Sequence, residues 1–275
     1  MSESSPPSAE RRLHRLPLEA RSVQSLDWGL VIDALAERAS TEAGRRLCVD
    51  LPWLQEASQA RAALVDVAEM FALRDAGSAP KLGGIEDVEP MLRACRKGEI
   101  LQGLDLLAIG HSLESLGRLR AQLDDVAPEA PSLHAHAIAI KPLPDLAAWL
   151  AASFDNRGEL DAQTYPQLTA LRGRKAKLHG RIRATLNDLR GQDRFEDTLQ
   201  DDFLGLRNDR YVVPVKAQHK NAGLGIVHDT SGSGATVFVE PWEIVELNNE
   251  LKICDAELRQ EERRILRDLS ERVAL

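Results

Sequence analysis

Two long segments constrain the fold of this chain more than any other feature. Each has a seam, a line of apolar residues at helical spacing, and a short β-type segment separates them. The first seam runs from Leu168 to Leu189 and the second from Ile244 to Ile265, with apolar residues three and four positions apart. Between them lie three short runs rich in β-branched residues: Tyr211–Lys216, Gly225–His228 and Thr236–Val239. Matching seams around an insert predict an antiparallel helical arm with a β module at its tip. The alternative is two unrelated helices that pack separately.

The segment before the arm has the apolar spacing of packed helices. Leu101 to Leu123 gives the longest of them, and turn residues such as Gly83 and Gly84 separate the shorter ones. Four prolines, at positions 128, 131, 142 and 144, are predicted to break the stretch that follows. Aromatic residues make up only 4% of the chain, which disfavours a β-sandwich. The predicted fold is mainly α, with a helical core domain, a long antiparallel helical arm and a small antiparallel β insert.

Composition excludes several classes of protein. Cys48, Cys95 and Cys254 form no CxxC pair, so the sequence predicts neither a zinc site nor a disulfide framework, but reduced thiols in a cytoplasmic protein. No apolar run approaches the roughly 20 residues that a membrane span needs. Residues 1–20 are polar and proline-rich, which predicts a disordered tail. The formal net charge of −8 does not favour nucleic-acid binding by the chain as a whole.

A local excess of positive charge nevertheless lies on the first half of the arm. This stretch contains eight basic residues and two acidic ones, Asp188 and Asp193, so its local net charge is eight minus two, or +6. The eight are Arg172, Arg174, Lys175, Lys177, Arg181, Arg183, Arg190 and Arg194, and the β module adds Arg207, Arg210, Lys216, His219 and Lys220. Such side chains can neutralise backbone phosphates, so the arm and its tip are a candidate nucleic-acid surface. The alternative is an ordinary solvated helix face.

The glycine-rich stretch from His228 to Thr236 is the most chemically distinctive. Its backbone N–H groups could hold a phosphate, but β-type sequence follows it where a nucleotide-binding loop needs a helix. A hairpin turn is the structural alternative. His228, Asp229 and Ser231 are residue types of a catalytic triad, yet they are almost adjacent in sequence, whereas triad members converge from separate parts of a fold. The sequence therefore predicts no catalytic residues, no metal site and no cofactor.

Several stretches together resemble the MutS2 family. The strongest is Gly225–Pro241, and the matching order along the chain runs from about Leu26 to the end. The others are Ile244–Leu251, Arg207–Lys216, Leu82–Pro90, and Leu26–Trp28 followed by Leu35–Ala39. In the terms of that family, the arm is the lever and the β module is the clamp.

The resemblance implies a bacterial MutS homologue that lacks the mismatch-recognition and connector domains. Such proteins keep the core, lever and clamp, followed by an ABC-type ATPase that uses ATP and Mg and usually by a C-terminal Smr endonuclease. The resemblance also implies a homodimer formed through the ATPase. It implies action on branched DNA in recombination suppression, or on stalled ribosomes in ribosome rescue.

The sequence departs from the family in two respects. It stops at Leu275, inside the returning lever helix, and it contains no GPNxxGKS/T-like motif and no Smr region, so no ATP-binding or nuclease residue can be placed. At Asp209 the family implies glycine, and the aspartate predicts a looser turn before Arg210. The expected domains are a tail (1–20), the core (21–155), the ascending lever helix (156–200), the clamp (201–242) and the returning lever helix (243–275), truncated before the ATPase.

The resulting hypothesis is that this chain is the core, lever and clamp part of a MutS2-like protein. It would bind nucleic acid and would not itself catalyse a reaction. It would couple that binding to an ATPase absent from this chain. The residues expected to contact nucleic acid are Arg207, Arg210, Lys216, Lys220, His228, Ser231 and Ser233. The expected partner is DNA or the ribosome, with no membrane involved. The alternative is a purely structural lever that passes ATPase motion to a protein partner without touching nucleic acid.

Overall fold

The computed structural model describes residues 25–51, 54–192, 195, 197–199 and 205–275. These residues form helices and one small four-stranded antiparallel sheet, so the predicted mainly α fold with a β insert is confirmed. The chain divides into two compact units, which are described separately. Unit 1 is Met1–Glu159 with Leu269–Leu275, and unit 2 is Leu160–Asp268. The tail predicted at residues 1–20 lies outside the described residues.

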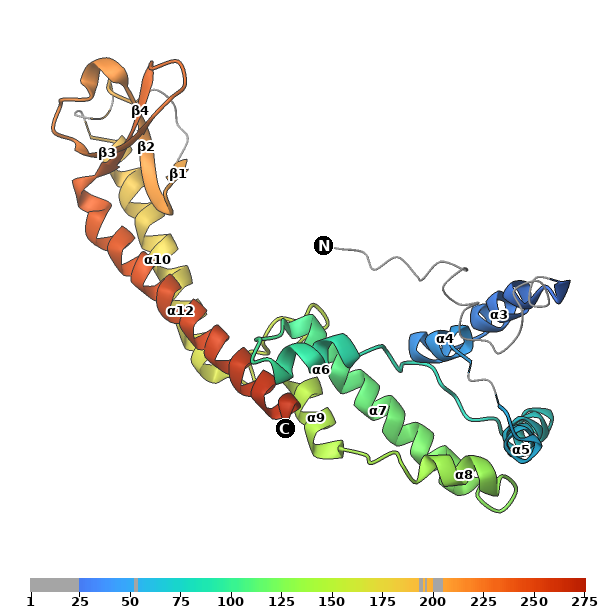
Figure 1. Cartoon of the computed structure of the whole chain (residues 1–275). Helices are drawn as coiled ribbons and strands as arrows, with labels where there is room; N and C mark the ends of the chain where they lie inside the picture. The colour runs from blue at the N-terminus through green and yellow to red at the C-terminus, as the bar shows by residue number, and fades with distance from the viewer. Residues whose placement is uncertain (1–24, 52–53, 193–194, 196, 200–204) are drawn as a thin grey trace. The chain divides into compact units, whose positions relative to one another are not determined.

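Unit 1 is helical in its described part. Helix α7 is the longest of its helices, and its first turn is capped reciprocally by Gln102 and Asp105. α7 packs against α9, where Gly110 lets the two helices approach, since a Cβ there would lie 3.0 Å from the Cβ of Leu150. The helices are α3 (Trp28–Glu37), α4 (Glu42–Val49), α5 (Ala57–Asp75), α6 (Glu89–Arg96), α7 (Gly103–Asp125), α8 (Pro131–Ala137) and α9 (Pro144–Ser153), labelled in Figure 1.

The prolines of unit 1 correct one expectation from the sequence. Pro131 and Pro144 do not only interrupt helical structure, because each one begins a helix. Proline suits the first helical position, where its missing N–H would have no partner in the helix and its fixed φ already fits. Pro166 begins the first helix of unit 2 in the same way.

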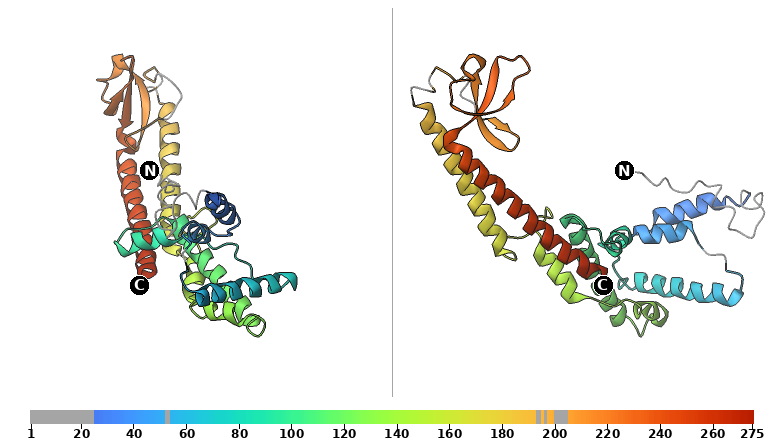
Figure 2. Two further views of the ribbon diagram at one scale, coloured as in Figure 1. Left: turned by 45° about the vertical axis from the view of Figure 1, so that its right-hand side comes forward. Right: turned by 60° about the vertical axis from the view of Figure 1, so that its left-hand side comes forward.

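Unit 2 is an antiparallel helical hairpin with the β module at one end. It is formed by α10 (Pro166–Arg190) and by α12 (Trp242–Ala274) as far as Asp268. The two helices lie side by side in both views of Figure 2. Cross-helix contacts fix the direction, because Gln167 bonds Glu261 while Lys175 bonds Asp255, so residue numbers rise along one helix as they fall along the other. The predicted arm is confirmed, and the alternative of two separately packed helices is wrong.

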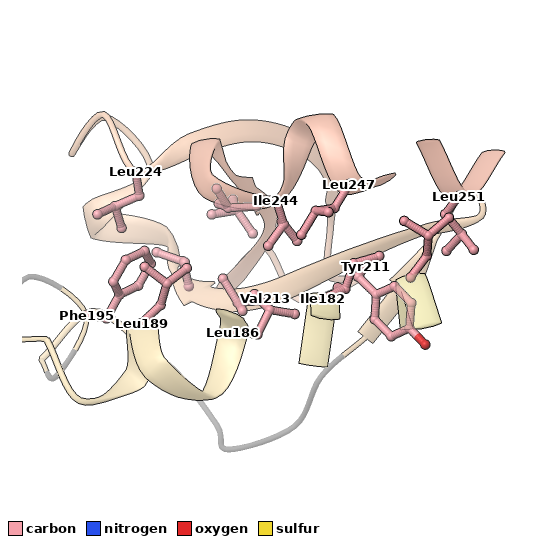
Figure 3. Close-up of a cluster of buried hydrophobic side chains, with 14 of the residues drawn as sticks. Ile182, Leu186, Leu189, Phe195, Tyr211, Val213, Leu224, Ile244, Leu247 and Leu251 are labelled. Atoms are coloured by element: carbon pink, nitrogen blue, oxygen red, sulfur yellow. The ribbon is translucent and has the colours of Figure 1, made fainter. Parts of the chain in front are cut away.

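The seams predicted from the sequence form the core of unit 2. Ile182, Leu186 and Ile244 are fully buried there, together with residues of the sheet (Figure 3). Leu178 belongs to the same buried cluster as Leu251 and Cys254. The two seams therefore meet at Leu178 and at Leu251 and Cys254.

The sheet has the strand order β1-β2-β4-β3, and all its pairs are antiparallel. The strands are β1 (Gly205–Arg207), β2 (Arg210–Lys216), β3 (Gly225–Thr230) and β4 (Thr236–Pro241). β1 is too short to give a sequence pattern and was not predicted. Asn208 and Asp209 join β1 to β2 with φ of 52° and 61°, and Arg207 pairs directly with Arg210. The turn is therefore a tight two-residue hairpin, and the looser turn expected from Asp209 is wrong, because aspartate tolerates the left-handed conformation.

None of the helices in the described part of the chain is both long enough and apolar enough to cross a membrane.

Candidate nucleic-acid interface

The β module, residues 205–241, is held at the end of the helical hairpin by apolar contacts. Val213, Val215 and Val239 point into the cluster that also contains Leu186 of α10 and Ile244 of α12. Strand neighbours alternate in direction, yet Val212 of β2 and Glu240 of β4 are also fully buried, so these strands are covered on both faces. The sheet is thereby fixed at the end of the helical hairpin (Figure 1).

A buried polar network ties the strands to the start of α12. Its centre is Glu240 of β4, whose side chain has no exposed surface. Arg210 of β2 donates to Glu240 Oε1 over 2.6 Å, and Asn248 Nδ2 donates to the same oxygen over 2.8 Å. His228 of β3 bonds the other carboxylate oxygen. A buried carboxylate is stable only when it is paired and hydrogen-bonded, and these three partners meet that condition.

This network occupies two of the residues predicted to contact nucleic acid. The Arg210 side chain is 19% exposed, and its second terminal nitrogen bonds Asn249 Oδ1 over 2.5 Å. His228 is 17% exposed and is held by Glu240. Both side chains therefore stabilise the module, and a phosphate contact by either one stays a prediction.

Neither Glu240 nor Asn248 is among the functional residues predicted from the sequence. Asn248 bonds the backbone of Tyr211 in both directions, accepting from its N–H and donating to its carbonyl, each over 3.1 Å. It thus satisfies the backbone of Tyr211 beyond Val213, where the pairing of β2 with β4 ends. One sequence signal could have indicated this role. A glutamate lies at the end of the apolar run of β4, and an acidic residue in a buried strand needs a partner.

The other predicted cations lie at the surface. Arg207 stacks over the Phe238 ring, with its Cζ 3.9 Å from the ring centroid, and it lies 3.3 Å from Asp229. Lys216 donates to the carbonyl of Asp197 over 3.0 Å. Lys220 is exposed and directly follows the short helix η1 (Ala217–His219). These three side chains can reach solvent without breaking the buried network.

The glycine-rich stretch is a β-hairpin turn between β3 and β4, as the structural alternative predicted. Ser231 N–H donates to the carbonyl of Thr236, and Thr236 N–H donates to Ser231 Oγ over 3.1 Å. Gly234 closes the turn with φ of +72°, which favours glycine. The Ser233 hydroxyl is exposed at the tip, 3.3 Å from Ser231 Oγ.

One titratable group lies where the module meets α10. His179 of α10 bonds the Tyr211 hydroxyl over 2.8 Å, and their rings meet edge to face. Burial lowers the pKa of His179 from its ordinary value, and the positive charge of Lys175 adds to this effect. The neutral imidazole is thus the form that fits the folded unit.

Within the described residues, no group of three or more His, Cys, Asp and Glu side chains is arranged to hold a metal ion. The chemistry that this surface supports is hydrogen bonding and charge pairing by Arg207, Lys216, Lys220 and the turn at residues 231–234. The antiparallel helical hairpin presents this β module at one end.

Comparison with known proteins gives this architecture a family context. An Endonuclease MutS2 of Anaeromyxobacter sp. (strain Fw109-5) is 36% identical over 250 residues, which is 91% of this chain and 31% of the relative. An Endonuclease MutS2 of Bacillus velezensis is 31% identical over 94% of this chain and 33% of the relative. A Putative endonuclease MutS2 of Bacillus subtilis (strain 168) is 29% identical, with the same coverage. No family model matches the chain.

The chain spans about a third of the length of these relatives. It is therefore related to a region of MutS2 proteins, over nearly its whole own length.

Proposed function

We propose that this chain is the core, lever and clamp region of a MutS2-family protein of the cytoplasm, and that its β module contacts nucleic acid through backbone phosphates. The similarity to one third of proteins named Endonuclease MutS2 supports the family. The surface of the module supports the contact, because Arg207, Lys216 and Lys220 reach solvent and the turn between β3 and β4 exposes the Ser233 hydroxyl. Lysine and arginine contacts to phosphates carry no base information, so binding should depend little on sequence.

The region would bind and transmit motion, while ATP hydrolysis and nuclease activity would reside elsewhere in the whole protein. In that protein, an ATPase using ATP and Mg would couple to the lever, and two copies would assemble through the ATPase. The target is branched DNA in recombination suppression or ribosomal RNA on a stalled ribosome. Both present the same phosphate chemistry to the module.

The test is a low-salt titration of the whole chain with duplex DNA, branched DNA and structured RNA. The informative variant is Arg207→Glu/Lys216→Glu/Lys220→Glu, which leaves Arg210 and its buried network intact. The control is Arg61→Glu/Arg96→Glu/Lys97→Glu, which makes the same charge change at exposed positions of unit 1. Weaker binding by the first variant alone supports the proposal, and the tightest of the three ligands identifies the target.

The alternative function is a structural lever that contacts only protein. If the wild-type chain binds none of the three nucleic acids, or if both triple variants bind as the wild type does, the module is not the contact surface. The salt bridges that cross the hairpin, between Arg172 and Glu262 and between Arg174 and Glu257, favour a stiff arm under either function.

A further inference from the structure

The six basic residues of α10 from Arg172 to Arg183 divide into two sets with different surroundings. Three of them form ion pairs with carboxylates of α12 across the hairpin. These are Arg172 with Glu262 at 3.2 Å, Arg174 with Glu257 at 2.8 Å, and Lys175 with Asp255 at 2.7 Å. This set compensates the acidic flanks of α12 and is explained by the hairpin itself.

The second set, Lys177, Arg181 and Arg183, is exposed on α10. None of the three forms an ion pair with any residue that the structure describes. Helical geometry places Lys177 and Arg181 one turn apart on one flank, and Arg183 on the other flank. The buried residues Leu178 and Ile182 lie on the opposite side of the helix.

The outer face of α10 also carries no acidic residue. From Pro166 to Asn187 the helix contains no Asp or Glu, and the first carboxylate is that of Asp188. The whole chain has 43 acidic and 35 basic residues, so an uncompensated positive face runs against its overall charge. Gly180 and Ala184 lie between the two basic flanks, and their small side chains leave the helix backbone accessible in the middle of the face.

We propose that this face of α10, formed by Lys177, Arg181 and Arg183, is a second nucleic-acid contact surface that holds the phosphate backbone alongside the arm. The inference rests on the proposed function, and it extends the contact from the β module onto the helical hairpin. Charge complementarity selects the occupant, since three unpaired cations repel another copy of the same face and attract phosphates. Low side chains between the flanks allow a phosphodiester chain to lie close to the helix backbone.

The test uses the whole chain with Lys177→Gln/Arg181→Gln/Arg183→Gln. The matched control is Arg259→Gln/Arg263→Gln/Arg267→Gln, which removes the same charge from exposed positions of α12. The free energy of unfolding of both variants should lie within about 0.5 kcal/mol of the wild-type value, because substitutions at exposed positions rarely change it more. The measured quantity is the slope of log K against log salt concentration for duplex DNA. We expect the α10 variant to lose about 2 to 3 units of slope, since each released phosphate contact accounts for roughly 0.9.

The control should keep the wild-type slope. Equal slopes for the wild type and the α10 variant, in a wild type that binds, would overturn this inference while leaving the β module as the contact surface. Equal losses in the α10 variant and the control would also overturn it, because they would show a response to net charge alone. A wild type that binds no nucleic acid overturns both this inference and the proposed function.

Discussion

Arg210 and Glu240 form an ion pair in which the carboxylate has no exposed surface, although 30 residues separate them in the chain. Replacing Glu240 by Gln leaves the guanidinium of Arg210 without its counter-charge in a site that water reaches poorly. Removing one partner of a buried pair costs about 3 to 5 kcal/mol. We expect Glu240→Gln to lower the free energy of unfolding of unit 2 by about 3 kcal/mol, the low end of that range, since Arg210 is partly exposed.

The measurement is urea unfolding of the variant and the wild type. The control is Arg207→Gln, which removes a half-exposed ion pair with Asp229 and should cost less than about 1 kcal/mol. Equal costs for the two variants would contradict the structural role of the buried pair. A large loss for Glu240→Gln also means that charge reversal at Arg210 tests folding and not nucleic-acid binding.

The sequence predicted the helical hairpin because its signal is local. Leu178, Ile182 and Leu186 recur at helical spacing, and a seam of that length must be buried against a second seam. The ion pairs across the hairpin could not be assigned beforehand. Arg174 meets Glu257 only in one register of the two helices, and spacing alone does not select that register.

The site was predicted less completely than the fold. Charge and glycine content marked the β module as a candidate surface, but they did not separate exposed cations from structural ones. Arg210 is engaged in the fold because β2 pairs with β4 and brings it beside the buried Glu240, a contact that depends on the strand order. No residue spacing in the sequence encodes that order.

The turn between β1 and β2 gives a second prediction. Asp209 has φ of 61°, a left-handed conformation that costs an L-residue roughly 1 to 2 kcal/mol and costs glycine little. Asp209→Gly should raise the free energy of unfolding by about 0.5 to 1 kcal/mol, after the extra entropy of unfolded glycine is subtracted. Urea unfolding measures the change. Asp209→Ala is the control, and it should not stabilise the chain, because it keeps the Cβ and loses the polar side chain.

A third prediction concerns pH. Burial lowers the pKa of His179 from the ordinary value of 6.5, so the unfolded chain binds a proton more readily than the folded one does. The stability that neutral His179 contributes is therefore fully present above pH 6.5, and it is lost as the pH falls below that value toward the lowered pKa. His179→Gln keeps a polar group near the Tyr211 hydroxyl but does not titrate.

The free energy of unfolding of both chains should be measured across this range. The wild type should lose more stability than His179→Gln as the pH falls, because every other titrating group is common to both. Parallel pH profiles would show that the imidazole is not held in its neutral form.

The last prediction concerns two glycines in the middle of α10. Gly173 and Gly180 lie on its outer face, and a Cβ added at either position would meet nothing within 4 Å. Alanine at an exposed helix position is more stable than glycine by about 0.5 to 1 kcal/mol, so Gly173→Ala/Gly180→Ala should raise the free energy of unfolding by roughly 1 to 2 kcal/mol. Gly225→Ala is the contrasting variant, because its Cβ would clash with the carbonyl oxygen of Glu240 and should destabilise the chain.

The free energies of unfolding of the wild type, the double alanine variant and Gly225→Ala are measured by thermal and urea unfolding. A double alanine variant that is less stable than the wild type would mean that the packing of unit 2 needs these glycines. A gain in stability would mean that both glycines lower the free energy of unfolding although the packing of the helix does not need them. That cost is expected if the backbone between Lys177, Arg181 and Arg183 must stay open to a closely approaching phosphate chain.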